Sequence, residues 1–232
     1  MNIRQMHYDF KKKFNKVDSQ QNRNMLVPEI DWVLNEASEI IVKMIAQPRL
    51  KNQFGFELNQ RSIDDIRTIV RTREEVSIVD NVATLPADYW HFLRGRLKMA
   101  KGKCKREGVL YVQQHDDEFE ESVLHKSSFE WEHVNGLFNE NGIKVFTDGT
   151  FTNEMLYLSY LRKLNYIHNA QDFRGGSYAI PGGATLTGSL NSELPDHLHR
   201  EIVDLAVLIA TGETNSPEYQ VRKDKLNFNN LN

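Results

Sequence analysis

The chain has 232 residues, of which 40% are hydrophobic and 26% are charged, and its formal net charge is −3 at pH 7. These values are typical of an ordinary globular protein with one large domain, or with one domain that carries an insertion. A net charge near zero excludes a global basic field of the kind that holds nucleic acid without sequence specificity.

No segment has the features of a targeting or membrane sequence. The opening residues lack the apolar core of a signal peptide. No window reaches the roughly 18 consecutive apolar residues of a membrane span. Cys104 is the single cysteine, so an internal disulfide cannot form. We therefore expect a protein that stays in a reducing cytoplasm, or in a particle assembled there, with no membrane partner.

The first part of the chain is predicted to be helical. An N-terminal arm, residues 1–24, begins with apolar residues among lysines that favour a short amphipathic helix. Pro28 is placed to open a stronger helix over residues 28–46, in which apolar residues repeat at helical spacing, and Pro48 follows its end. A shorter helix is predicted over residues 62–72, where Ser and Asp have the spacing of a capping box.

A strand and a third long helix are expected next. Val76, Ile78 and Val82 indicate a strand. Pro86 then lies where prolines often lie in the first turn of a helix, and several aromatic residues follow it. We therefore predict a helix over residues 86–98 that buries most of these aromatic side chains.

Between about residues 108 and 167 the hydrophobic period changes to two, which favours strands. The dipeptides Asn141-Gly142 and Asp148-Gly149 are turn signals, and the first is a strong hairpin signal. The strands predicted around them cover residues 109–114, 131–134, 143–146 and 154–161. We expect an antiparallel strand meander inserted in a helical body, which is an α+β class.

The last part of the chain contains a loop, a helix and a tail. Residues 174–192 are rich in Gly, Ser and Thr, and a long loop of this kind is usually functional or mobile. A helix is predicted over residues 195–211, with Gly212 as its natural end. The polar residues 213–232 are expected to form a flexible tail. This leaves residues 25–212 as the folded domain.

No complete catalytic or metal-binding motif occurs in the sequence. Gly183 and Gly188 have the spacing of a phosphate-binding loop, but Ser189 stands where that loop requires a lysine. His197 and His199 diverge on a helix and cannot share a metal there. We therefore predict no cofactor, no metal ion and no enzymatic activity.

The three tryptophans, Trp32, Trp90 and Trp131, each fall in a predicted ordered element, so packing in the core is the default expectation. The alternative is that some of them anchor an interface, where Trp, Tyr and Arg dominate the binding energy. Both interpretations stay open at this point.

Three segments in order resemble head-to-tail connector proteins of tailed bacteriophages. They are residues 85–93 after a Val/Ile strand, the tyrosine-rich strand 154–163 with its terminal basic pair, and the Leu-Pro helix 193–207 before a polar tail. Their order is similar to that in adaptor and ring proteins of podovirus-type phages. The Asn- and Lys-rich style is similar to that of crAss-like phages.

The resemblance implies a structural virion protein, one of about twelve copies in a homo-oligomeric ring below the portal. Its partners would be other copies of itself, the portal protein and neighbouring connector or tail rings. Genome DNA would pass through the lumen without sequence specificity. The protein would be in the host cytoplasm before assembly and in the virion afterwards. The residues expected to contact subunits or rings are Arg174, Tyr178, Ile180, Leu186, Leu190, Tyr219, Phe228 and Leu231.

Two other functions are open from the sequence. One is a small phage hydrolase that uses carboxylates of the meander and of the acidic run 116–121. Exchange of each acidic residue for its amide would reveal such an enzyme. The other is a dimeric regulatory protein that binds DNA, against which the near-neutral charge and the lack of a clear helix-turn-helix pattern both argue.

Overall fold

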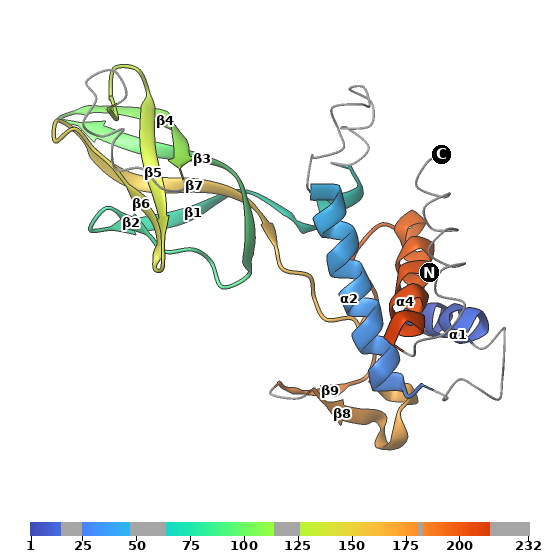
Figure 1. Ribbon diagram of the computed structural model, residues 1–232. Helices are drawn as coiled ribbons and strands as arrows, with labels where there is room; N and C mark the ends of the chain where they lie inside the picture. The colour runs from blue at the N-terminus through green and yellow to red at the C-terminus, as the bar shows by residue number, and fades with distance from the viewer. Residues whose placement is uncertain (15–24, 47–63, 114–125, 181–182, 214–232) are drawn as a thin grey trace, which may run out of the picture. The chain divides into compact units, whose positions relative to one another are not determined.

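The computed structural model describes residues 1–14, 25–46, 64–113, 126–180 and 183–213. The chain divides into two compact units (Figure 1). The helical unit combines the two ends of the chain, Met1–Thr68 and Leu164–Asn232, and the barrel unit is the segment between them, Ile69–Lys163. The α+β class is confirmed. None of the helices in the described residues is both long and apolar enough to cross a membrane.

The helical unit is built on helices α1 (Ile3–Phe14), α2 (Val27–Ala46) and α4 (His199–Glu213). Helices α1 and α2 both pack against α4 (Figure 1). Each helix turns one apolar stripe inward, as its 3.6-residue period predicts. The buried apolar residues of this core include Met6, Phe10, Ile30, Leu34, Ala37, Ile202, Val203 and Ala206. The helices predicted over residues 28–46 and 195–211 are therefore confirmed, but α4 continues through Gly212, which was expected to end it.

Short elements connect the barrel unit's end to α4. They are the 3₁₀ turns η4 (Ala170–Asp172), η5 (Arg174–Gly176) and η6 (Asp196–Leu198), and the strands β8 (Ser177–Ala179) and β9 (Thr185–Thr187). Strands β8 and β9 pair antiparallel. The glycine-rich segment predicted as one long loop thus contains a two-stranded ribbon.

The barrel unit is a closed barrel with the strand order β1-β2-β6-β5-β4-β3-β7. The turn η2 (Arg67–Ile69) leads into it. Its strands are β1 (Val70–Val79), β2 (Val82–Ala83), β3 (Tyr89–Lys101), β4 (Cys104–Gln113), β5 (His133–Asn139), β6 (Gly142–Val145) and β7 (Thr152–Arg162). All neighbouring strands are antiparallel except β4 and β5, which are parallel. The ring of strands is closed at β2 by a short seam, because β1 pairs with β2 only at Ile78 and Val79.

The barrel has its own hydrophobic core, because inward and outward side chains alternate along its strands. In β3, for example, Gly95, Leu97 and Met99 are buried, whereas Arg96 and Lys98 between them are partly exposed. The core residues shared by the strands include Val76, Leu97, Met99, Leu110, Val134, Ile143, Leu156, Leu158 and Tyr160.

The predicted helix over residues 86–98 is wrong, because these residues lead into and form most of β3. Gly95, Leu97 and Met99 alternate with a period of two, which is typical of a strand. This pattern outweighs the position of Pro86, which would suit the first turn of a helix. The predicted short helix also ends early: residues 64–69 are helical, but β1 starts at Val70.

The prediction that the strands form an antiparallel meander inserted in a helical body is wrong, because they form a closed barrel. The strands predicted over residues 109–114, 143–146 and 154–161 fall largely in β4, β6 and β7. However, the sheet begins at Val70, closes on itself, and contains a parallel pair. Barrel closure depends on pairings between β1 and β7, which are far apart in sequence. A local period does not encode them.

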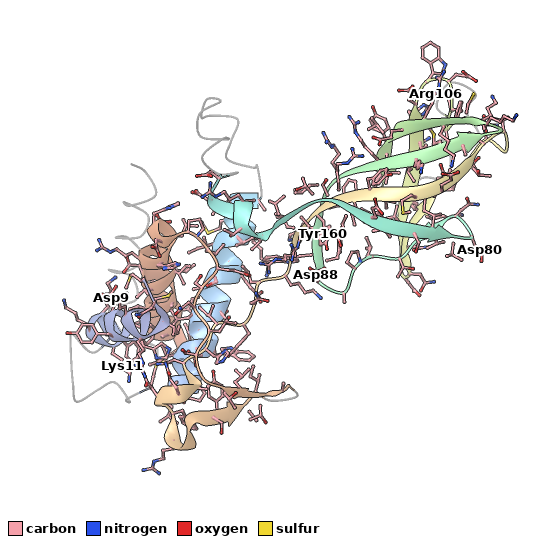
Figure 2. All side chains as sticks on the ribbon, turned by 180° about the vertical axis from the view of Figure 1, so that it is seen from behind. Asp9, Lys11, Asp80, Asp88, Arg106 and Tyr160 are labelled. Carbon is pink, nitrogen blue, oxygen red and sulfur yellow. The ribbon has the colours of Figure 1, made fainter. Side chains whose placement is uncertain are left out.

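Tyr160 and Asp88 form a hydrogen bond within the barrel unit (Figure 2). The Tyr160 hydroxyl donates to Asp88 Oδ1 over 2.9 Å. Burial, together with the neighbouring Asp88 carboxylate, raises the pKa of Tyr160 to about 12. The neutral phenol is thus the form that the folded barrel favours.

We expect the chain to lose stability between pH 10 and 12 because of Tyr160. A pKa that is higher in the folded than in the unfolded state gives a stabilisation that is complete below the unfolded value of about 10. It is lost as the pH rises towards the folded value. Urea unfolding of the wild type and of Tyr160→Phe at several pH values between 10 and 12 measures this loss of stability. The wild type should lose more stability than the variant, and equal losses would contradict the assignment.

Candidate functional site

The candidate contact residues lie around the β8–β9 ribbon, as far as the structure describes them. Arg174 and Leu190 are exposed, Ile180 and Leu186 are half-buried, and Tyr178 is buried. Tyr219, Phe228 and Leu231 lie outside the described residues, as does the predicted tail. The structure therefore gathers the first five near one ribbon of the helical unit, but it turns Tyr178 inward.

Tyr178 belongs to a buried network around Asp31, a fully buried residue of α2. Asp31 Oδ2 accepts hydrogen bonds from the Tyr178 hydroxyl over 2.6 Å and from the backbone N–H of Asn169 over 3.0 Å. Asp31 Oδ1 lies 2.7 Å from Nε2 of His7 in α1. One carboxylate thus joins α1, α2, the η4 turn and β8.

The electrostatics of this network favour the neutral form of its two phenols. Burial and the hydrogen bond to Asp31 raise the pKa of Tyr178 far above that of a free phenol. Burial, and then the charge of Asp31, raise the pKa of Tyr166 as well. A buried carboxylate is tolerated only when donors satisfy its oxygens, and here both oxygens have partners.

Asn35, one helical turn after Asp31 in α2, also binds the backbone of the segment before η4. Its side-chain amide donates to the carbonyl oxygen of Ile167 over 2.7 Å, and its Oδ1 accepts from the Ile167 N–H over 2.9 Å. Asp31 and Asn35 therefore satisfy backbone groups of the segment that leads from Leu164 to η4. Because Asp31 is fully buried, we interpret these hydrogen bonds as structural: they hold segments of the helical unit in position.

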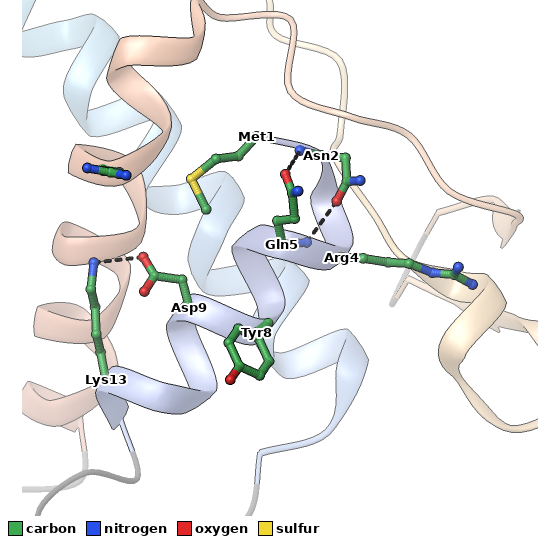
Figure 3. Close-up of a pocket in the computed structure, with 8 residues that line it drawn as sticks. Met1, Asn2, Arg4, Gln5, Tyr8, Asp9 and Lys13 are labelled. Atoms are coloured by element: carbon green, nitrogen blue, oxygen red, sulfur yellow. Dashed lines mark hydrogen bonds and ion pairs between the residues drawn. The ribbon is translucent and has the colours of Figure 1, made fainter.

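A pocket with a volume of about 690 Å³ lies along α1 (Figure 3). We call it the α1 pocket; its lining includes Arg4, Gln5, Tyr8, Asp9 and Lys13 of α1 and Arg200 of α4. The Tyr8 side chain is apolar over most of its length and is 72% exposed. The pocket therefore offers an uncovered aromatic ring among polar and mainly cationic groups.

The cations of the α1 pocket differ in their partners. Arg4 pairs with Asp172 at 2.9 Å. Lys13 pairs with Asp9 at 2.8 Å (Figure 3) and with Asp204 at 2.7 Å. Burial lowers the pKa of Lys13, but these carboxylates outweigh that effect and raise it. Arg200 has no ion pair with any described residue, so it is the cation most available to an outside group.

The outer surface of the barrel carries a cross-strand network of charges. The hairpin of β3 and β4 has seven cationic residues and one acidic residue, namely Arg94, Arg96, Lys98, Lys101, Lys103, Lys105, Arg106 and Glu107. Glu107 contacts Arg73 at 2.9 Å and Arg96 at 3.6 Å. Glu154 contacts Lys105 at 2.9 Å and Lys98 at 3.6 Å. Hydrogen bonds from Arg73 and Lys105 lower the pKa of Glu107 and Glu154, respectively.

An exposed tryptophan stands on a tight turn of the barrel. We call residues 128–132 the Trp131 loop. Ser128 and His133 close it with two backbone hydrogen bonds of 2.9 and 3.2 Å. The carbonyl of Glu132 accepts from the N–H of Val109 over 2.7 Å, which attaches the loop to β4. Phe129 is buried, whereas Trp131 is 84% exposed.

The expectation that the tryptophans pack in the core is wrong for two of the three. Trp131 and Trp32 are exposed, and Trp90 is half-buried beside His91. The alternative of interface anchors stays a prediction for Trp131 and Trp32. A signal was present in the sequence: Trp131 lies between Glu130 and Glu132, which is an unusual setting for a core residue.

The described residues contain no group of three or more His, Cys, Asp or Glu side chains that could hold a metal ion. His197 contacts Asp65 at 2.6 Å, whereas His199 is buried and contacts the carbonyl of Leu194 at 2.8 Å. The two histidines thus take different partners. No model of a known protein family matches the chain, and no similar sequence is found among curated proteins.

Proposed function

We propose that the chain is a structural subunit of an oligomeric ring in the head-to-tail connector of a tailed bacteriophage, below the portal and around the DNA passage. The observation that carries this proposal is the exposed Trp131 on a closed, well-anchored turn. The barrel fills its own core with other residues, so this indole has no part in the barrel's packing.

Large exposed apolar side chains on ordered elements are typical of surfaces that a partner covers. Trp131 and Tyr111 supply them in the barrel unit, and Tyr8, Trp32 and Met44 supply them in the helical unit. Both units therefore present candidate contact surfaces. A ring subunit needs two different surfaces, one for each neighbour.

The segment order that resembles connector proteins also supports the proposal. The Leu-Pro segment at residue 85 leads into β3, the tyrosine-rich strand is β7, and the last Leu-Pro segment leads into α4. Two of these three segments are barrel strands, so the resemblance covers both units. Passage of DNA requires no tight binding, which fits the pairing of many barrel cations with Glu107 and Glu154.

The experiment that tests the proposal is co-expression with portal and connector proteins of a tailed bacteriophage. Native mass spectrometry and electron microscopy should show a closed ring of this chain, and the ring should join the portal or another ring. A chain that stays monomeric and never joins these partners would contradict the proposal. Salt-sensitive binding of duplex DNA by the isolated chain would favour a DNA-binding regulator instead.

A further inference from the structure

We propose that the Trp131 loop of one copy docks into the α1 pocket of a second copy, and that this contact links neighbouring subunits. The inference rests on the proposed ring function and names the surfaces that form the ring contact. It is carried by three features: the rigid presentation of Trp131, the size and aromatic lining of the pocket, and the opposite charges of the two surfaces.

The Trp131 loop is already ordered in the free subunit, which lowers the entropy lost on binding. Its two closing hydrogen bonds and its attachment to β4 fix the backbone on both sides of Trp131. The Phe129 side chain of this loop is buried and so anchors the loop in the barrel. The cationic groups of Arg106 and Lys101 lie 5.2 and 5.7 Å from the centroid of the Phe129 ring. A preformed loop with one protruding indole has the properties of an interface anchor.

The α1 pocket has the size and surface for such an anchor. It is an open hollow of about 690 Å³, which is large enough to admit an indole. Tyr8 offers an exposed ring against which an indole can stack or pack edge to face. Arg4, Lys13 and Arg200 surround it with cations, and guanidinium groups also bind the face of an indole.

The charges of the two surfaces are complementary. Glu130 and Glu132 flank Trp131, and their side chains are 65% and 53% exposed although they contact Lys101 and Arg106. Their outer oxygens remain accessible to further donors. Three cations and the single acid Asp9 line the pocket, and Arg200 has no ion pair with a described residue. Asp172 pairs with Arg4, and Asp9 and Asp204 pair with Lys13, so the charge match rests on Arg200, which can meet the exposed carboxylates of Glu130 and Glu132.

The two surfaces lie in different units of the chain, so every copy has one of each. Contacts between unlike surfaces join copies head to tail, and such a series closes into a ring when the rotation between copies divides a full turn. A symmetric dimer would instead use the same surface twice. The inferred contact is therefore of the kind that a ring subunit needs.

Charge reversal with rescue tests the contact in the full chain. We expect Arg200→Glu, and separately the double variant Glu130→Lys/Glu132→Lys, each to weaken self-association at least about ten-fold. Chains that carry all three changes should recover a large part of that loss. Arg200 lies in the first turn of α4, where an acidic residue suits the helix dipole, so the fold should tolerate the exchange. Glu140→Lys, at the other end of β5, is the matched control and should associate normally.

Cross-linking locates the contact within whatever assembly forms with the connector proteins. In a Cys104→Ser background, chains with Trp131→Cys are mixed with differently tagged chains with Tyr8→Cys and treated with a short bismaleimide. We expect a covalent dimer of the two tags, and none when Glu140→Cys replaces Trp131→Cys. A ring that forms without this product, and that assembles normally despite the charge reversals, overturns the contact but leaves the ring function standing. Failure of any ring to form overturns both.

Discussion

Replacing Asp31 with alanine is expected to destabilise the helical unit by about 3–5 kcal/mol. Asp31 is fully buried, and the variant would leave the Tyr178 hydroxyl, the Asn169 N–H and the His7 ring without their acceptor. Each buried donor without a partner costs about 1–3 kcal/mol. The stability of Asp31→Asn should lie between that of Asp31→Ala and that of the wild type, because the asparagine amide keeps one acceptor oxygen.

Urea unfolding gives the size of the loss, and hydrogen exchange read by mass spectrometry shows where it occurs. Protection should fall in α1, in α2 and at Tyr178, which the network joins. The matched control is Asp204→Ala, which removes a half-exposed carboxylate from Lys13 while Asp9 remains as a partner. It should cost less than about 1 kcal/mol. A similar cost for Asp31→Ala would show that the buried network does not stabilise the unit.

Much of the helical unit was predictable from the sequence, whereas the Asp31 network was not. The apolar periods of α2 and α4 are local and clear, so their positions could be predicted. Asp31 is polar and lies on the buried stripe with Leu34 and Ser38, which is the one signal that the sequence offered. Its partner Tyr178 is 147 positions away, and a pairing over that distance depends on the whole fold.

The barrel shows the same limit in a different form. A hairpin at this place was predictable because the Asn141-Gly142 signal is local, and β5 and β6 do pair there, but the turn residues are Glu140 and Asn141 and Gly142 is the first residue of β6. The β3 strand was misread because Pro86 and a cluster of aromatic residues suit the start of a helix. The parallel pairing of β4 with β5 and the closure of β1 on β7 have no local signal.

The candidate contact surfaces divide in the same way. The sequence directed attention to the glycine-rich segment, and five of its predicted contact residues do lie around the β8–β9 ribbon. It left Trp131 open between core and interface, since a period of two does not show which face of a short turn meets solvent. Only the closed turn between Ser128 and His133 decides that Phe129 points inward and Trp131 outward.

Gly142→Ala is expected to destabilise the barrel by about 3 kcal/mol or more. Gly142 has φ +147°, a conformation that L side chains rarely adopt, and an added Cβ would lie 2.1 Å from the carbonyl oxygen of Ala83. That oxygen belongs to backbone, so it cannot turn aside as a flexible side chain would. Relief of the clash requires β2 to move away from β6.

The clash falls on a weak seam of the barrel, which is why we expect a large effect. Strand β2 has only two residues, and it is held to β6 by the pairs Val82 with Lys144 and Ala83 with Ile143. In the closed order, β2 is the link between β1 and β6, so its displacement opens the barrel there.

Gly149→Ala is the matched control, because Gly149 also has a positive φ, +81°, but no atom lies within 4 Å of its added Cβ. Its cost should be only the backbone strain of about 1 kcal/mol. Thermal and urea unfolding of both variants therefore separate the close approach of β2 from the strain of a positive φ, and equal losses would show that the β2–β6 seam does not hold the barrel closed.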